Sequence, residues 1–313
     1  MRFKLLALVL SSLQAYTAIA DTANNFFTLD KVSAEMASGA LSGKTKVRVY
    51  NSQSADKLSQ LNWNYSNAAV VTGSLYWDLT PWVSLGASGW TTIGSRGGYM
   101  DDTDWLNGSS QGWTHQSQHP DTRLNFANEF DLNIKEWLLN EPDYRLGVMA
   151  GYQENRYSLK STGGSYNYTD EETGSPVIGS FPAGTTGIGY KQRFNMPYIG
   201  LTGRYRYERF EFGGTFKFSG WVSAFDNDEH YLRNTTFKVN TANQNFYSLA
   251  ADIGYYMTPN AKIYLNGIWS RTTNKKGNMS VNDHDEGNVV NLADAGGIEN
   301  YNYMTSVGLK YAF

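Results

Sequence analysis

Period-two alternation of apolar and polar residues is the feature that most constrains this chain. Between residues 124 and 135 the apolar set is Leu124, Phe126, Phe130, Leu132 and Ile134, and the polar set is Asn125, Glu129, Asp131, Asn133 and Lys135. One face of such a strand suits lipid and the other suits a polar lumen. The pattern returns along most of the chain, and no later stretch has 18 consecutive apolar residues. The sequence therefore predicts a membrane β-barrel rather than helical spans.

The connections between these runs differ in length at the two ends. Very short turns at 80–81, 140–143, 208–209 and 258–260 alternate with long connections rich in Gly, Ser, Asn and Asp. Short periplasmic turns and longer outer loops are typical of outer-membrane barrels. We expect an all-β fold, a ten-stranded antiparallel transmembrane β-barrel with long extracellular loops and both termini in the periplasm. The strands are predicted at 32–50, 59–79, 82–97, 122–138, 144–160, 187–207, 210–226, 244–257, 261–275 and 299–313.

The N-terminus and the composition agree with export. A basic start, an apolar run at 5–10 and Ala18-Ile19-Ala20 predict a cleaved signal peptide over 1–20, leaving 21–313 as one barrel domain. The chain has no cysteine, which excludes disulfides and thiol catalysis. Its formal net charge of −3 gives nucleic-acid binding no electrostatic support. The alternating last strand ends on an aromatic residue, Phe313, and this resembles the recognition signal of outer-membrane barrels.

Ten strands make a barrel too narrow for a general diffusion pore, so we expect function in the outer loops. Asp102 and Asp104 are predicted on the loop after the third strand, and Asp226, Asp228 and His230 on the loop after the seventh. At roughly 2.5 Å of height per tilted residue, both groups lie about 40–50 Å above the periplasmic turns. The third and seventh strands are nearly opposite in a ring of ten, so the two groups should face each other.

These residues offer chemistry for hydrolysis. Asp228 and His230 are two residues apart, so in an extended segment both side chains point the same way, and a carboxylate beside an imidazole raises its basicity. Asp102 and Asp104 have the same spacing and can position a water or share a proton. Spacing alone leaves three alternatives open: catalysis, a metal site, or a solvated loop. His115, His119 and His284 lack this arrangement and are interpreted as loop residues.

Several segments strongly resemble the omptin family of outer-membrane endopeptidases. They are WTTIGSRGG at 90–98, MDDTDW at 100–105, DNDEHY at 226–231, LSGKTK at 41–46, MPYIGL at 196–201 and TPNAK at 258–262. The likeness covers essentially the whole mature chain. It implies a dyad of Asp228 and His230 that activates water, a facing couple of Asp102 and Asp104, and a pocket in which Asp226 receives a basic side chain.

The chain departs from the omptin pattern in the substrate pocket. Val47 stands where omptins usually carry a glutamate, and His115 replaces a second acidic residue. We therefore expect a retained but relaxed preference for Arg or Lys, carried by Asp226 alone, because a buried carboxylate favours a cationic partner.

A lipid site is predicted on the outer wall. Arg156 and Arg193 share the lipid-facing parity of neighbouring strands at about 30 Å, which is headgroup height. Outward arginines there suit lipid A phosphates, although simple snorkelling is the alternative. The resemblance adds Tyr152 and Glu154 to a lipopolysaccharide site and implies that the lipid is needed for activity.

Two functions of different classes remain. The first is a lipopolysaccharide-dependent endopeptidase of the outer membrane, with its site on the extracellular side, that cleaves peptides and proteins carrying basic residues. The second is an adhesin or receptor that only binds cationic ligands in an acidic groove; a calcium-stabilised structural barrel is a weaker third. We assign no cofactor and no metal ligand, and expect lipopolysaccharide as the required lipid and no nucleic-acid partner.

Overall fold

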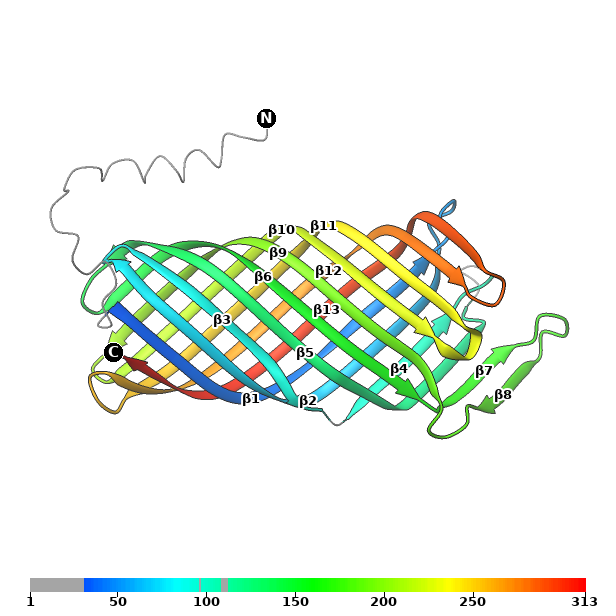
Figure 1. The fold of residues 1–313 in the computed structure, drawn as a ribbon, viewed down its shortest axis with the longest axis horizontal. Helices are drawn as coiled ribbons and strands as arrows, with labels where there is room; N and C mark the ends of the chain where they lie inside the picture. The colour runs from blue at the N-terminus through cyan, green and yellow to red at the C-terminus, as the bar shows by residue number, and fades with distance from the viewer. Residues whose placement is uncertain (1–30, 96, 108–111) are drawn as a thin grey trace, which may run out of the picture.

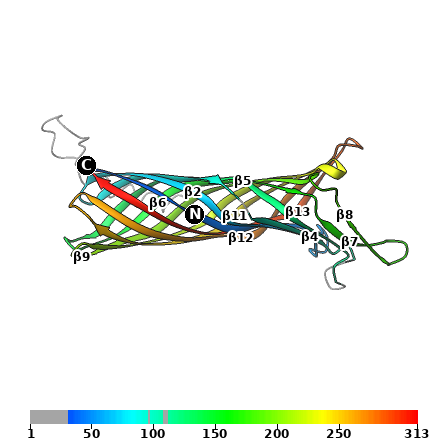
Figure 2. The same ribbon diagram turned by 90° about the horizontal axis from the view of Figure 1, so that it is seen from below.

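A computed structural model describes residues 31–313 except 96 and 108–111. The expected signal peptide at 1–20 lies outside these residues. Figure 1 shows one long barrel of tilted strands, with the start of β1 and the C-terminus at the same end. The barrel is narrower in Figure 2 than in Figure 1, so its cross-section is flattened. Within the described ranges, no helix is long and apolar enough to cross a membrane.

The structure consists almost entirely of antiparallel strands. They are β1 (Val32–Tyr50), β2 (Lys57–Thr80), β3 (Val83–Gly94), β4 (Gly98–Asp104), β5 (His115–Asn140), β6 (Tyr144–Thr162), β7 (Ser165–Thr169), β8 (Pro176–Ser180), β9 (Thr186–Tyr207), β10 (Phe210–His230), β11 (Thr235–Tyr256), β12 (Ala261–Asp283) and β13 (Asn288–Ala312), with one short 3₁₀ helix, η4 (Tyr231–Arg233). β1 pairs with both β2 and β13, which closes the ring.

The prediction of a ten-stranded barrel is confirmed. β3 and β4 each lie between β2 and β5, so together they occupy one place in the ring. The break between them includes Gly97, whose φ of 86° lies in the left-handed region that glycine tolerates. Where the sequence predicted one strand at 82–97, the chain therefore makes two, and the second reaches Asp104.

Most strands extend further from the short turns than the sequence predicted. β5 begins at His115 instead of 122, β10 ends at His230 instead of 226, and β11 begins at Thr235 instead of 244. Above the lipid both faces of a strand meet water, so apolar alternation stops while the backbone ladder continues. The hairpin β7–β8 was not predicted; β7 pairs with the outer end of β5, and the hairpin projects beyond the barrel rim in Figure 1.

The lumen is filled in two different ways. Its lower part carries charged side chains, among them Asp131, Lys217, Asp252 and Lys262, around a cavity of about 170 Å³. Above them lies a buried cluster of mainly aromatic and aliphatic side chains, including Trp63, Tyr65, Tyr157, Tyr190 and Phe194. This cluster lies alongside β4 and the outer end of β10, because Trp63 pairs with Met100 and Tyr190 with Asp228, and we call it the floor of the site.

Candidate active site

The predicted acidic groups lie on strands rather than on loops. Asp102 and Asp104 belong to β4, and Asp226, Asp228 and His230 to the end of β10. The expectation of loop positions was wrong because the strands continue beyond the lipid. At roughly 2.5 Å per residue Asp102 lies about 48 Å above the start of β3, well outside an apolar band of about 25 Å. A hydrogen-bonded sheet therefore fixes each side chain more firmly than a loop would.

Asp228 and His230 make direct contact on the inner face of β10. His230 Nε2 lies 3.4 Å from Asp228 Oδ2, and both side chains are buried. Arg233 of η4 donates a hydrogen bond from Nη2 to His230 Nδ1 at 2.8 Å. A guanidinium only donates, so Nδ1 accepts in this contact, and Nε2 is the ring nitrogen that faces Asp228. Nδ1 is thus the basic nitrogen of this imidazole, and Arg233 covers it.

The other oxygen of Asp228 has a special position. Asp228 is 2% exposed, and its Oδ1 is buried with no hydrogen-bond partner in the described part of the protein. Buried carboxylate oxygens are ordinarily satisfied, because an unsatisfied one costs about 1–3 kcal/mol. An acceptor of this kind beside an imidazole is suited to hold a water or a substrate N–H.

Asp102 on β4 lies close enough to Asp228 for the charge of Asp228 to affect its pKa. Its carboxylate accepts a hydrogen bond from Ser59 Oγ at 3.3 Å. Burial raises the pKa of Asp102 well above its ordinary value, the neighbouring charges of Asp104 and Asp228 raise it further, and Arg233 opposes the rise. Carboxylates from opposite walls of the barrel therefore act on one another, as the sequence predicted. Among the described residues no group of three or more His, Cys, Asp or Glu side chains is placed to hold a metal ion.

Asp226 is a buried acidic residue that contacts Tyr190 of the hydrophobic cluster. It is 8% exposed and accepts hydrogen bonds from the Val239 amide at 2.7 Å and from the Tyr190 hydroxyl at 3.2 Å. Tyr190 stacks on Trp63 with ring centroids 5.6 Å apart, and Val47 belongs to the same buried cluster. Burial, and next the charge of Asp228, raise the pKa of Asp226 well above its ordinary value. It has no cationic partner in the described structure, so a cation that entered would be paired with it.

The histidines outside the dyad have different surroundings. His115 is the first residue of β5, pairs with Asp104 in register, and packs against Tyr168 with ring centroids 4.9 Å apart. His119 is buried in β5, stacks on Phe181, and contacts Ser117 Oγ and Gly163 O. Both were expected in a loop, and that expectation was wrong; only His284 lies in a turn.

Two residues near the acidic groups were not predicted from the sequence, Arg233 and Tyr168. Burial and the charges of Asp102 and Asp104 raise the pKa of Tyr168 to about 12, which places this β7 hydroxyl near the acidic couple. The only signal for Arg233 was its place three residues after His230. For Tyr168 there was none, because the β7–β8 hairpin itself was not predicted.

The predicted lipid-facing residues lie together on the outer wall. Arg156 of β6 and Arg193 of β9 are direct register partners, and both are exposed. Arg156 forms an ion pair with Glu154 at 2.5 Å, while the Tyr152 hydroxyl donates to Asn195 Oδ1 at 3.0 Å. The arrangement presents two neighbouring guanidinium groups, one of them held in place by a carboxylate.

Comparison with known proteins places this geometry in a family. Residues 28–313 match the Omptin family. The chain belongs to that family. It is 57% identical to Protease 7 of Escherichia coli O157:H7 over 317 aligned residues, covering all of both chains. It is 53% identical to the outer membrane protease OmpP of Escherichia coli K12, again over the full length of both.

A more distant relative and a crystal structure also support membership of this family. The plasminogen activator of Yersinia pestis is 44% identical over 91% of this chain and 90% of its own length. The crystal structure of the outer membrane protease OmpT from Escherichia coli superposes with a TM-score of 0.89 at 58% identity, covering 92% of this chain and 98% of that one. This omptin is thus an outer-membrane protease with the fold that the alternation predicted.

Proposed function

We propose that this omptin is an endopeptidase in which Asp228, His230, Asp102 and Asp104 activate water, in which Asp226 selects a basic side chain, and which depends on lipopolysaccharide. One observation carries the catalytic part of the proposal. His230 Nε2 lies 3.4 Å from Asp228 Oδ2, and the charge of Asp228 acts on Asp102 on the opposite wall. A binding groove needs negative charge only, whereas a carboxylate that orients an imidazole is what a general base requires.

The hydrolytic step follows from the hydrogen bonds of His230. Asp228 faces the Nε2–H group, orients the ring and stabilises the imidazolium that forms when Nδ1 takes a proton from water. The hydroxide attacks the amide carbonyl, and the Nδ1 proton then passes to the leaving nitrogen. The side chain of Arg233 is exposed and can leave Nδ1 when substrate enters. Asp102 and Asp104 position the water from the other side, so no covalent enzyme intermediate is needed.

Selection of a basic side chain rests on Asp226. Its burial without a cationic partner makes the ionised carboxylate costly, and an arginine or lysine of the substrate would remove that cost. Val47 contributes only an aliphatic surface there, so the preference should be weaker than two carboxylates would give. His115 lies beside Asp104, where its imidazole offers the residue after the cut a weaker attraction than a carboxylate would.

Dependence on lipopolysaccharide rests on the outer wall. Arg156 and Arg193 lie on the strands whose outer ends lead to the groove: β9 pairs with β10 up to His230. Phosphates bound by these arginines would hold β6 and β9 together near the site. We expect refolded protein to be poorly active without lipopolysaccharide and to gain activity when it is added.

The test is mass-spectrometric mapping of cuts in a mixed peptide pool by protein refolded with lipopolysaccharide. The wild type should cut next to Arg or Lys, and His230→Ala should lose cleavage while it still binds a cationic peptide, since the acidic groups remain. The Arg156→Gln/Arg193→Gln variant should lose most of the activation by lipid. Cleavage by His230→Ala at the wild-type rate would refute the mechanism, and peptide binding without any cleavage by the wild type would support the receptor alternative.

A further inference from the structure

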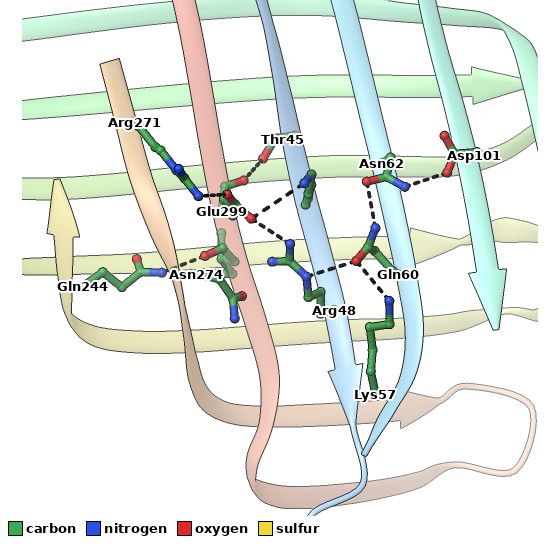
Figure 3. Close-up of polar contacts among 12 residues, drawn as sticks. Thr45, Arg48, Lys57, Gln60, Asn62, Asp101, Gln244, Arg271, Asn274 and Glu299 are labelled. Carbon is green, nitrogen blue, oxygen red and sulfur yellow. Dashed lines mark hydrogen bonds and ion pairs between the residues drawn. The ribbon is translucent and has the colours of Figure 1, made fainter. Parts of the chain in front are cut away.

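A second cationic surface lies on the outer wall, on strands that the proposed lipid site does not use. Lys46 and Arg48 of β1 alternate with Thr45 and Val47, which are buried inside the barrel, so the two basic side chains point outward. Glu299 of β13 is the register partner of Lys46 and shares this direction. Arg271 of β12 lies across the next strand pair, and Figure 3 shows both arginines directed at Glu299.

One carboxylate holds three cations in this group. Glu299 Oε2 lies 2.7 Å from Arg48 Nη2 and 3.9 Å from Lys46 Nζ, and Oε1 lies 3.0 Å from Arg271 Nη2. Three positive charges on one negative charge leave an excess of two. Lys44 adds a further cation on the same face, while the nearest acid across β2, Asp101, accepts a hydrogen bond from Asn62. We call Lys46, Arg48, Arg271 and Glu299 the β1/β12 cluster.

The β1/β12 cluster is fixed in place before any ligand arrives. Glu299 is 8% exposed, and Arg48 also donates from Nε to Gln60 Oε1 at 3.1 Å. The remaining terminal nitrogen of Arg48, Nη1, is buried and has no hydrogen-bond partner in the described structure. Arg48 is therefore the fixed part of the cluster, and the more exposed Lys46 and Arg271 are the cations that a ligand would meet first.

The lower end of the cluster lies near the height of the lipid headgroups. Trp269, Tyr301 and Tyr303 pack edge to face on the outer wall, and outward aromatic rings mark the membrane interface. Tyr301 is the register partner of Lys44 and of Arg271, so the cations begin at the level of these rings. By strand rise Lys44 lies about 30 Å and Arg48 about 40 Å above the start of β1.

We propose that the β1/β12 cluster is a second binding site for the phosphates of outer-leaflet glycolipid. It lies across the barrel from Arg156 and Arg193, since β13 is five places from β6 in the ring of ten. Two such sites on opposite walls would hold the outer ends of the strands from both sides. Multiple acceptor oxygens and negative charge make phosphate the ligand that this excess of guanidinium and ammonium groups fits best.

The experiment counts and titrates purified bis-phosphorylated lipid A on the detergent-solubilised, refolded protein by native mass spectrometry. Lys46→Gln/Arg48→Gln/Arg271→Gln should bind one lipid A fewer than the wild type, with affinity at this site lowered at least on the order of tenfold. Lys238→Gln removes an exposed lysine nearer the outer end of β11, outside the cluster, and should change nothing. The charge-preserving Lys46→Arg/Arg48→Lys/Arg271→Lys variant should keep the second lipid, and circular dichroism checks that each barrel is folded.

Three results would overturn the proposal. The first is equal lipid A binding by the Lys46→Gln/Arg48→Gln/Arg271→Gln variant and Lys238→Gln. The second is equal binding of lipid A from which both phosphates have been removed. The third is displacement of the second lipid by millimolar inorganic phosphate, which would make the cluster a site for the free anion. Repeating the titration in an Arg156→Gln/Arg193→Gln background separates this site from the first, because the second lipid should persist there.

Discussion

Replacing Asp226 by asparagine removes the charge of the side chain and keeps its shape. The asparagine Oδ1 can keep the 2.7 Å bond from the Val239 amide, and its Nδ2 can donate to the Tyr190 oxygen, which already accepts from Gln192 at 3.0 Å. The Tyr190 proton then loses its acceptor, while the repulsion between Asp226 and Asp228 disappears. These changes oppose each other, so the fold should be little affected. The loss falls on substrate: a hydrogen-bonded charge pair in a site this buried contributes about 1.5–3 kcal/mol.

That free energy corresponds to about a 10- to 100-fold change in discrimination. The assay compares kcat/KM for two peptides that differ only by arginine or its neutral isostere citrulline before the cut, with wild type and Asp226→Asn. The wild type should prefer arginine by about this factor, and the variant should cleave both peptides at similar rates. If Asp226→Asn kept the full preference for arginine, another group would be the specificity determinant and the argument from burial would be refuted.

Three more perturbations test neighbouring parts of the site. Val47→Glu adds a second carboxylate to the cluster around Tyr190, so the arginine-to-citrulline ratio of kcat/KM should rise by about tenfold; an unchanged ratio would show that the side chain is remote from the pocket. Arg233→Gln removes the charged donor from His230 Nδ1, and kcat/KM should increase about tenfold at pH 8; a decrease would mean that Arg233 assists the reaction. The raised pKa of Asp226 predicts that an uncleavable arginine peptide releases a proton on binding, so its affinity should fall as pH drops through that pKa. The citrulline peptide and the Asp226→Asn variant should show no such pH dependence, as measured by calorimetry.

The ring of strands was predictable because lipid imposes a strict pattern. Within the apolar band every second residue must face hydrocarbon, and Phe130, Leu132 and Ile134 are apolar residues at such alternate positions. The short turns at 80–81 and 208–209 then fix which strands are neighbours. The opposition of Asp102 and Asp228 followed from counting strands and residues, and the field of Asp228 at Asp102 agrees with it.

The outer part of the barrel was harder to predict because lipid does not impose an apolar alternation there. The sequence pattern predicted a loop for His115 and His119, although they continue β5 with polar residues on both faces. The contact between Arg233 and His230 depends on the turn geometry of η4, where Asn234 takes a left-handed φ of 44° that residue type alone does not specify. The resemblance to omptins named the four proposed catalytic residues but gave no indication of Arg233 or Tyr168.

The outer end of the barrel gathers acids that ionise less readily than isolated ones. Asp102 and Asp226 both have raised pKa values, and the charge of Asp228 contributes to each rise. A soft structure would move these carboxylates apart, but β4 and β10 are each hydrogen-bonded to strands on both sides, so they cannot separate without breaking the ladder. The repulsion is therefore retained in the resting enzyme. On the proposed mechanism a cationic segment of substrate would relieve this repulsion, so the same electrostatic field would favour a basic peptide at the site.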